Sequence, residues 1–437
     1  MKKATILTSL FAFMLCFVIN SCTNEDEQTA LTPKVSAVSH RLSAEQAQQN
    51  ALKFVNNVLT TRGGANNITV SEVKAISAKK TLTRSSADSI NLDTLYYVVN
   101  FDNNNGFVIA SSDDREPPVF AYIEEGTYEE SEDSISGDVM FKKEVTYNAG
   151  YEGFICALQE IETKNRTKYH KNPEEDDHFF DGGITGPTFD DTPGDRYNTF
   201  KVMSPLLKTK WGQTTYLTYC PENYTGCVIT AVSQICSYLK APHDFYWIDN
   251  GTRYNCTMDW DRINSECQGT NLGNVVSPDL FDQVSRLMRF WGVVFDAEYN
   301  SDGTSADSEY AISQMQEIGF NATSLSDYNC ANVIVELNKG NRIIYMRGNG
   351  RYYHVWLVFR KYIAGHAWVV DGYIRSQNGY NTDYYLHCNW GWGGDKNGYF
   401  LSNVFDTDAG PEYDDNATAT RGYENYQYNL KTSVICK

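Results

Sequence analysis

The sequence has few of the features that mark several large protein classes. Its 437 residues include 55 Asp and Glu but only 37 Lys and Arg, which gives a net charge of −18 at pH 7. Contacts to phosphate groups need clustered positive charge, so this balance argues against a nucleic-acid-binding protein. The sequence also contains no CxxC pair, no Cys/His spacing typical of zinc sites and no internal repeat. It therefore indicates neither nucleic-acid recognition nor a zinc centre.

The sequence also lacks a long apolar run of the kind that spans a membrane. The apolar stretch at its start, residues 6–19, follows two lysines and is short for a span, which is the pattern of a secretory signal. The Ser21-Cys22 pair that follows resembles the end of a bacterial lipoprotein signal. In that class Cys22 carries the lipid and becomes the mature N-terminus. We therefore expect an exported outer-membrane or cell-surface lipoprotein. Plain secretion is the alternative, because Asn20 is unusual before the serine.

The composition supports a folded, multidomain protein. Apolar residues make up 41% of the chain and aromatic residues 14%, which is enough to build large cores. Composition shifts divide the chain into a signal, a tether, a small α+β domain, an exposed linker rich in charge, Gly and Pro, and a second domain dense in aromatics. The predicted bounds are 1–21, 22–39, 40–164, 165–199 and 200–437. Linkers of this kind are where proteases cut.

Local patterns predict the elements of both domains. In the first, residues 41–62 form a helix with a Ser43/Gln46 capping box, residues 95–101 and 107–114 form a hairpin, and residues 144–163 form a second helix. In the second, helices at 227–240, 278–292 and 307–319 precede a series of strand-like runs. Helices first and strands later favour an α+β fold with an antiparallel sheet.

Cys227 occupies the first turn of the helix predicted at 227–240. Three interpretations compete: a reactive thiolate, half of a disulfide, or a small buried apolar residue. Thr225 is the expected N-cap, and Gly226 allows a tight bend. The unpaired N–H groups of a helix start favour an anion, so the pKa of this thiol is expected to fall from about 8.5 to roughly 3.5–7.5.

Other cysteines bear on the second interpretation, because export places the chain where disulfides persist. Cys256 and Cys267 flank a short polar loop and are the first guess for a bridge. Spacing alone does not give the connectivity.

A nucleophilic cysteine needs a base, and the histidines in the strand-like runs are His354, His366 and His387. His366 follows Gly365 at the predicted head of an apolar strand, where its ring either faces a cleft or is a satisfied buried histidine. It lies about 140 residues after Cys227, within the roughly 130–150 residues typical of papain-like enzymes. Asn389 opens a run of tryptophans and glycines that follows, which includes Trp392.

Several stretches, taken together and in order, resemble the streptopain family of bacterial cysteine peptidases, which have a papain-like core. They are PLLKTKWGQTTYLTYCP (205–221), TGCVITAVSQICSYL (225–239), RLMRFWGVVFDAEYNSDGTSA (286–306), GHAWVVDGY (365–373) and NWGWGGDKNGYF (389–400). The upstream stretch YYVVNFDNNNGFVIASSDDREPPVFAYIEEG (96–126) resembles the inhibitory propeptide of the same family. The resemblance covers most of the chain outside the signal and linkers.

The resemblance implies a role for each matching residue. Cys227 would be the nucleophile, His366 the general base, and Gln213 an oxyanion-hole donor. Asn389 and Trp390 share the role of orienting the histidine, while Trp392 belongs to the surrounding wall. Two other residues, Ile229 and Ser233, depart from those common after the family's cysteine without replacing it.

The implied activity is peptide-bond hydrolysis through a thiolate–imidazolium pair and a thioester, with no metal or organic cofactor. The partners are protein or peptide substrates, the chain's own propeptide as inhibitor, and a membrane through the lipid on Cys22. Cleavage in the linker would release the active enzyme from this zymogen. Two alternatives are a binding lipoprotein that has lost activity and another thiol acyltransferase, such as a transglutaminase.

Overall fold

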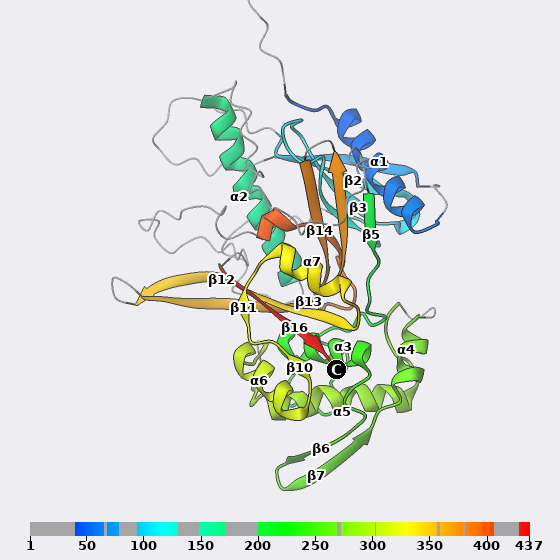
Figure 1. The fold of residues 1–437 in the computed structure, drawn as a ribbon, viewed down its shortest axis with the longest axis vertical. Helices are drawn as coiled ribbons and strands as arrows, with labels where there is room; N and C mark the ends of the chain where they lie inside the picture. The colour runs from blue at the N-terminus through cyan, green and yellow to red at the C-terminus, as the bar shows by residue number, and fades with distance from the viewer. Residues whose placement is uncertain are drawn as a thin grey trace, which may run out of the picture. The chain divides into compact units, whose positions relative to one another are not determined.

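Residues 40–171, here called the N-terminal region, form two helices and an antiparallel meander in the computed structural model (Figure 1). The structure describes residues 40–64, 68–77, 94–129, 148–171, 200–268, 272–301, 303–355, 359–378, 381–405 and 428–437. The predicted signal, the tether and residues 172–199 of the linker lie outside these ranges. The elements of the N-terminal region are α1 (Ala44–Thr61), β1 (Val70–Ile76), β2 (Tyr96–Phe101), η1 (Asp102–Asn104), β3 (Phe107–Ser111), β4 (Val119–Ile123) and α2 (Ala149–Lys171).

The sequence signals for this region are confirmed. Ser43 caps α1, and both hydrogen bonds of the capping box with Gln46 are present. The apolar face of α1 is buried, and β2 and β3 pair as the predicted hairpin. The second helix begins later and ends later than expected, so residues 165–171 of the predicted linker are helical.

Residues 200–437, here called the C-terminal region, place their α-helices before the strands at residues 342–436, as predicted, although short strands also lie before and between the helices. The helices are α3 (Cys227–Leu239), α4 (Trp260–Gln268), α5 (Pro278–Val294), α6 (Ser308–Ile318), α7 (Cys330–Asn338) and η2 (Ser402–Phe405). The strands are β5 (Phe200–Met203), β6 (Asp244–Asp249), β7 (Thr252–Thr257), β8 (Glu298–Asn300), β9 (Gly303–Ser305), β10 (Asn321–Ala322), β11 (Ser326–Asp327), β12 (Arg342–Val355), β13 (Phe359–Asn378), β14 (Asn381–Asn389), β15 (Gly398–Leu401) and β16 (Tyr428–Cys436). The predicted α+β class is confirmed.

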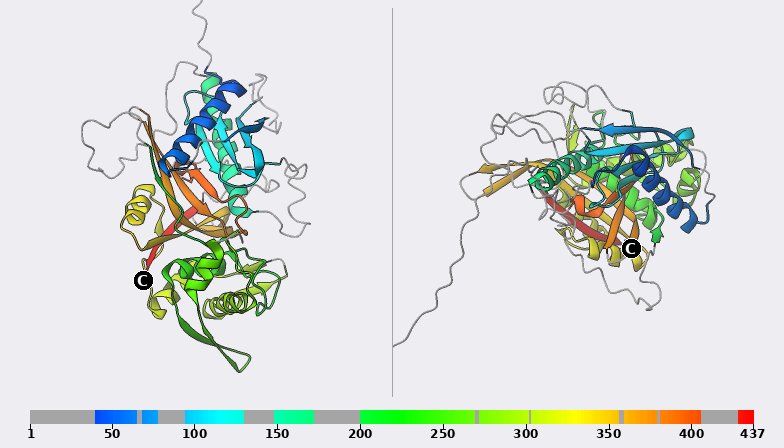
Figure 2. Two further views of the ribbon diagram at one scale, coloured as in Figure 1. Left: turned by 90° about the vertical axis from the view of Figure 1, so that its right-hand side faces the viewer. Right: turned by 90° about the horizontal axis from the view of Figure 1, so that it is seen from above.

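One antiparallel sheet runs through both regions. Its main path is β1-β2-β3-β4-β15-β14-β13-β12-β16-β10, and β4 of the N-terminal region pairs with β15 of the C-terminal region. The β6–β7 hairpin is separate from this sheet and projects beyond α5 (Figures 1 and 2). The sheet therefore joins the two regions through main-chain hydrogen bonds.

Strands β12 and β13 separate two hydrophobic cores. Alternate residues of a strand point to opposite faces. Trp368 and Val370 of β13 join the core that includes α1, α2 and the N-terminal strands, whereas Ala367 and Val369 join the core built on α3, α4 and α5. Helix α3 is buried on nearly all of its faces and packs against β13.

The described residues contain neither a membrane-spanning helix nor a metal-binding cluster. No helix among them combines the length and apolarity needed to cross a membrane. Within the same ranges, no group of three or more His, Cys, Asp and Glu side chains is arranged to hold a metal ion.

Candidate active site

Cys227 is the first residue of α3, but the residue that caps this helix is Gly226, not the predicted Thr225. Gly226 has φ 92° and ψ 148°, a conformation that favours glycine, and an added Cβ would lie 2.9 Å from the carbonyl oxygen of Thr304. The Thr225 hydroxyl instead donates to the Gln213 carbonyl at 3.2 Å and lies 2.9 Å from the Thr230 hydroxyl. The bend at glycine thus sets the direction in which α3 starts.

The Cys227 thiol is unbridged and half-buried against strand β13. Backbone N–H groups of Ala367, Val228 and Cys227 itself face the sulfur. Burial nevertheless raises the pKa of this thiol, which these N–H groups offset only in part. The expected fall in its pKa is therefore wrong for this conformation, because loss of water outweighs the helix start.

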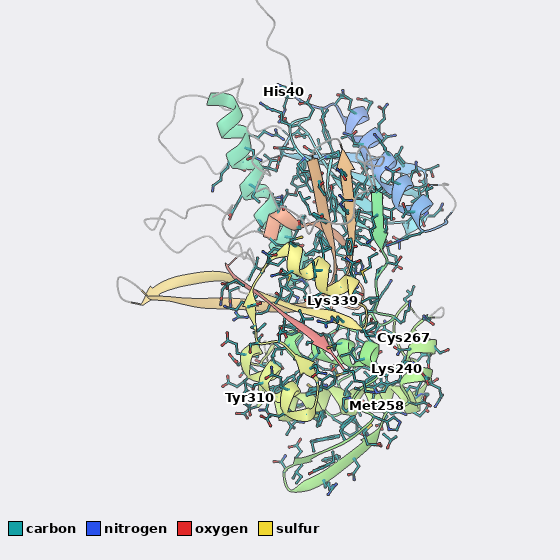
Figure 3. The ribbon with its side chains drawn as sticks, in the orientation of Figure 1. His40, Lys240, Met258, Cys267, Tyr310 and Lys339 are labelled. Carbon is teal, nitrogen blue, oxygen red and sulfur yellow. The ribbon has the colours of Figure 1, made fainter. Side chains whose placement is uncertain are left out.

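The predicted bridge between Cys256 and Cys267 is also wrong. Both thiols are buried but unbridged (Figure 3 labels Cys267). The Cys256 sulfur lies 3.7 Å from the sulfur of Met258, and Cys267 packs beside the Trp211 indole. Cys256 and Cys267 therefore pack against different residues, although they are close in the sequence.

His366 lies well inside β13 instead of at the head of a strand, and its ring is buried. The imidazole Nε2 lies 3.0 Å from the main-chain oxygen of Trp390, and the ring stacks on Trp368 at 5.9 Å between centroids. Since a carbonyl only accepts, Nε2 carries the proton and Nδ1 the lone pair. Burial lowers the pKa of His366 to about 4, against the opposing effect of the Trp390 carbonyl.

The structure brings the candidate nucleophile and base to neighbouring positions but in uncharged forms. The sulfur of Cys227 faces the N–H of Ala367, the residue that follows His366. A raised thiol pKa and a lowered imidazole pKa together favour neutral groups near pH 7. Burial in this conformation therefore disfavours the thiolate–imidazolium pair.

Gln213 is also brought to the start of α3. Its main-chain oxygen accepts from the Thr225 N–H at 2.8 Å, and its side chain is buried with no hydrogen bond to a described residue. The preceding residue, Gly212, forms a β-bridge with Trp392. The loop that carries Gln213 thus lies between the start of α3 and the tryptophan-rich turn.

Asn389 and Trp390 have different surroundings. Trp390 contacts His366 through its main-chain oxygen, while its indole donates to the Lys396 carbonyl at 3.1 Å. The Asn389 amide bonds Gln234, Thr209 and Gly391 and makes no hydrogen bond to His366. The prediction left open which residue orients the histidine; in this structure the contact comes from the carbonyl of Trp390.

Sequence reasoning missed Gln234, which lies two turns after Cys227 in α3. Its side chain is completely buried and bonds Trp211, Thr209 and Asn389. The available signal was an amide in a stretch of the predicted helix that has no charged residue. Buried polar side chains are nearly always hydrogen-bonded, so such a residue predicts a polar contact inside the core.

Comparisons with known proteins place these residues in a family. The sequence model of the peptidase C10 family matches residues 208–400, and the model described as Spi protease inhibitor matches residues 39–148. The chain belongs to the streptopain-like C10 peptidases. It is a cysteine peptidase made as a zymogen, and residues 39–148, in its N-terminal region, match the inhibitory propeptide.

Two named proteases agree with this assignment. Streptopain from Streptococcus pyogenes is 23% identical over 397 residues, covering 84% of this chain and 86% of streptopain. The thiol protease/hemagglutinin PrtT from Porphyromonas gingivalis is 24% identical over 341 residues, covering 71% of this chain and 34% of PrtT. Among solved structures, a fragment of Prevotella intermedia prointerpain A matches with TM-score 0.47 at 20% identity, covering 83% of this chain and 98% of that one.

The N-terminal region of this C10 peptidase contacts the tryptophan-rich turn directly. An added Cβ on Gly150, in the first turn of α2, would lie 2.1 Å from the indole of Trp390. The Asn148 amide donates to the Asp395 carbonyl at 2.6 Å. The start of α2 therefore packs against the same residue whose carbonyl binds His366.

His387, the other buried candidate histidine, belongs to a different cluster. Its Nδ1 lies 2.6 Å from Asp371, and its Nε2 lies 3.9 Å from Glu124 of the propeptide. These three side chains line a cavity of about 590 Å³ whose lining residues include neither Cys227 nor His366. His387 therefore lies where the propeptide meets the rest of this peptidase, away from the candidate nucleophile.

Proposed function

We propose that this chain is an exported, lipid-anchored cysteine endopeptidase in which Cys227 and His366 carry the chemistry. The observation that supports this most strongly is the position of the Cys227 sulfur, at a helix start and beside the residue that follows His366. The Trp390 carbonyl holds the proton of His366 on Nε2, which leaves Nδ1 to act as the base.

In the proposed reaction, His366 takes the thiol proton and the sulfur attacks the carbonyl carbon of the scissile peptide. The Gln213 amide and the Cys227 N–H donate to the developing oxyanion, a contribution of about 3–4 kcal/mol per donor in comparable sites. The imidazolium then protonates the leaving amine, and a thioester remains. Water attacks the thioester while the imidazole takes its proton, and that proton returns to the sulfur when the acid leaves.

We propose further that the conformation described above is the latent one. The start of α2 covers Trp390, and burial keeps both Cys227 and His366 neutral. Cleavage within residues 165–199 would remove this cover and allow water and substrate to reach the pair. Replacing Gly150 with Leu should force α2 away from the indole and speed processing of the full-length chain several-fold. Gly64→Leu, whose added Cβ would make only ordinary contacts of 3.4 Å or more with Leu59, controls for replacing a glycine of the N-terminal region.

The direct test is cleavage of a fluorogenic peptide by the processed protein under reducing conditions. We expect turnover by the wild-type chain, and loss of at least a thousandfold in the Cys227→Ser and His366→Gln variants. A thiol-directed epoxide should label Cys227 in the processed wild-type chain. Turnover that survives in Cys227→Ser would rule out this nucleophile, and amine incorporation without hydrolysis would indicate a transferase instead.

Lipid anchoring is the least supported part of the proposal and has its own test. The Ser21-Cys22 pair after a short apolar run supports lipidation at Cys22. Three acyl chains, as bacterial lipoproteins carry, would hold the protein at a membrane, whereas one chain would hold it weakly. We expect membrane-bound protein from the wild-type gene and soluble export from Cys22→Ala. Equal release of both would favour plain secretion.

A further inference from the structure

Gln234 forms the centre of a buried, uncharged hydrogen-bond network that joins the segments carrying the candidate site. Its Oε1 accepts from the Trp211 N–H at 2.9 Å, from the Asn389 amide at 3.2 Å and from the Thr209 hydroxyl at 3.3 Å. Its Nε2 donates to the Asn389 side-chain oxygen at 3.1 Å. Every hydrogen-bonding atom of this one side chain therefore reaches another segment of the chain.

The contacts of Asn389 extend the network to the histidine. Its amide also donates to the Thr209 carbonyl at 3.0 Å, and its oxygen accepts from the Gly391 N–H at 3.3 Å. Trp390 lies between these two anchored residues, and its carbonyl receives the Nε2 proton of His366. Holding the main chain on both sides of Trp390 fixes the direction in which that carbonyl points.

The network also contacts the segment that leads to Gln213. Thr209 and Trp211 precede Gln213 by a few residues, and both bond Gln234. Cys227 begins the helix in which Gln234 lies. A buried polar group left without its partner destabilises the fold, so the network favours one arrangement of these three segments.

We infer that Gln234 is a positioning residue for catalysis, which holds the Trp390 carbonyl, and through it the His366 ring, in register with Cys227. This inference rests on the proposed function. Gln234 does not touch the reacting atoms; it acts through Asn389 and Trp390. Because small misplacements of catalytic groups cost up to about a hundredfold in rate, loss of this amide should lower kcat more than it raises KM.

The test compares four full-length chains: wild type, Gln234→Met, Gln234→Glu and Ser233→Ala. Methionine keeps the length of the side chain without its hydrogen bonds. Ser233 is the matched control, because it is buried in the same helix and its hydroxyl has no hydrogen-bond partner among the described residues. Each chain is processed by a trace of tagged wild-type enzyme, which is then removed before kinetics.

We expect kcat to fall ten- to a hundredfold in Gln234→Met with KM within threefold, and to stay within twofold in Ser233→Ala. A protonated glutamic acid still has a donor for Asn389, whereas a carboxylate does not. The activity of Gln234→Glu relative to wild type should therefore be nearest to one in acid and fall as pH rises. A residue with only a structural role would change the unfolding midpoint without producing this pH profile.

A second readout does not depend on turnover. The ¹⁵N signals of the His366 imidazole, assigned by their loss in His366→Gln, report which nitrogen carries the proton in the full-length chain. We expect the Nε2–H form in wild type and Ser233→Ala, and a mixture in Gln234→Met. Unchanged signals together with an unchanged kcat would overturn the inference. If the wild-type chain cleaves no peptide, the proposed function fails, and the ¹⁵N signals still decide the role of Gln234.

Discussion

Each region of the molecule contains a buried polar cluster, and the two clusters differ in whether their side chains are charged. The C-terminal region uses neutral groups, with Gln234 and Asn389 exchanging hydrogen bonds in both directions. The N-terminal region buries charge, with Arg166 reaching Asp113 at 2.7 Å, Glu162 at 3.1 Å and Glu116 at 3.3 Å. The neutral cluster joins the segments that carry the candidate site, and the charged cluster joins segments of the N-terminal region.

The charged cluster does not keep all its groups ionised. Burial, then the neighbouring Glu116 carboxylate, raise the pKa of Glu162 well above its usual range, and burial also raises the pKa of Glu116. Burial opposes ionisation of Asp113 too, but the hydrogen bond from Arg115 and the charge of Arg166 outweigh it, so that pKa is lowered. The charged cluster around Arg166 is therefore the one whose stability depends on pH. The network around Gln234 is neutral throughout.

The largest effect should come from removing the central cation. Arg166→Met leaves the buried carboxylates without their shared partner. Loss of one member of a buried ion pair lowers the free energy of unfolding by about 3–5 kcal/mol. Urea unfolding of the full-length Cys227→Ser chain at pH 7 measures this. Arg262→Met is the control, because Arg262 pairs with Asp279 at the exposed surface, where solvent screens the pair, and should change stability far less. Equal losses in the two variants would contradict the comparison.

Placing a charge in the neutral network should make it behave like the charged one. Asn389→Asp removes the donors to Thr209 and Gln234 and sets an acidic oxygen against two acceptors. We expect a loss of about 2–3 kcal/mol at pH 8, and a smaller loss at pH 5, where a protonated carboxyl regains one donor. Asn389→Leu should lose stability without this pH dependence. If the stability losses of Asn389→Asp and Asn389→Leu change with pH in the same way, the introduced carboxyl does not act through the hydrogen-bond network.

Much of the fold could be predicted from the sequence because its signals are local. The Ser43/Gln46 capping box and the apolar face of α1 need only residues close in the chain. The hairpin of β2 and β3 likewise follows from alternation and a turn. Such features survive in the tertiary structure because the core buries the same faces that the pattern indicates.

The candidate site could be predicted only as a set of residues, since its physical state depends on non-local contacts. Thr225 has the chemistry of an N-cap, but the approach of Thr304 requires the backbone bend at Gly226. The pKa of Cys227 follows burial against β13, which no spacing reveals. His366 and His387 both lie in apolar strands, and only tertiary partners, a carbonyl for one and Asp371 for the other, tell them apart.

A smaller effect is expected from neutralising one acid of the charged cluster. A carboxyl whose pKa is raised on folding adds stability while it is protonated, and that stability is lost as pH rises through the folded pKa. Glu162→Gln mimics the protonated form, so it should match wild type in acid and become the more stable protein as pH rises, with a gain of up to about 1.4 kcal/mol per pH unit. Unfolding midpoints between pH 5 and 9 measure this. Glu72→Gln, at an exposed position, should follow wild type throughout.

The smallest effect should come from the edge of the neutral network. The Ser237 hydroxyl donates to the Gln234 carbonyl at 2.7 Å and lies 3.3 Å from the Thr209 hydroxyl, but it does not bond the side-chain amide that reaches Asn389. Ser237→Ala should therefore cost about 1 kcal/mol, the net value of one ordinary hydrogen bond, and the same amount at pH 5 and pH 8. Urea midpoints at the two pH values measure it. A cost that grows with pH would mean that ionisable groups control this network as well, and the contrast between the two clusters would fail.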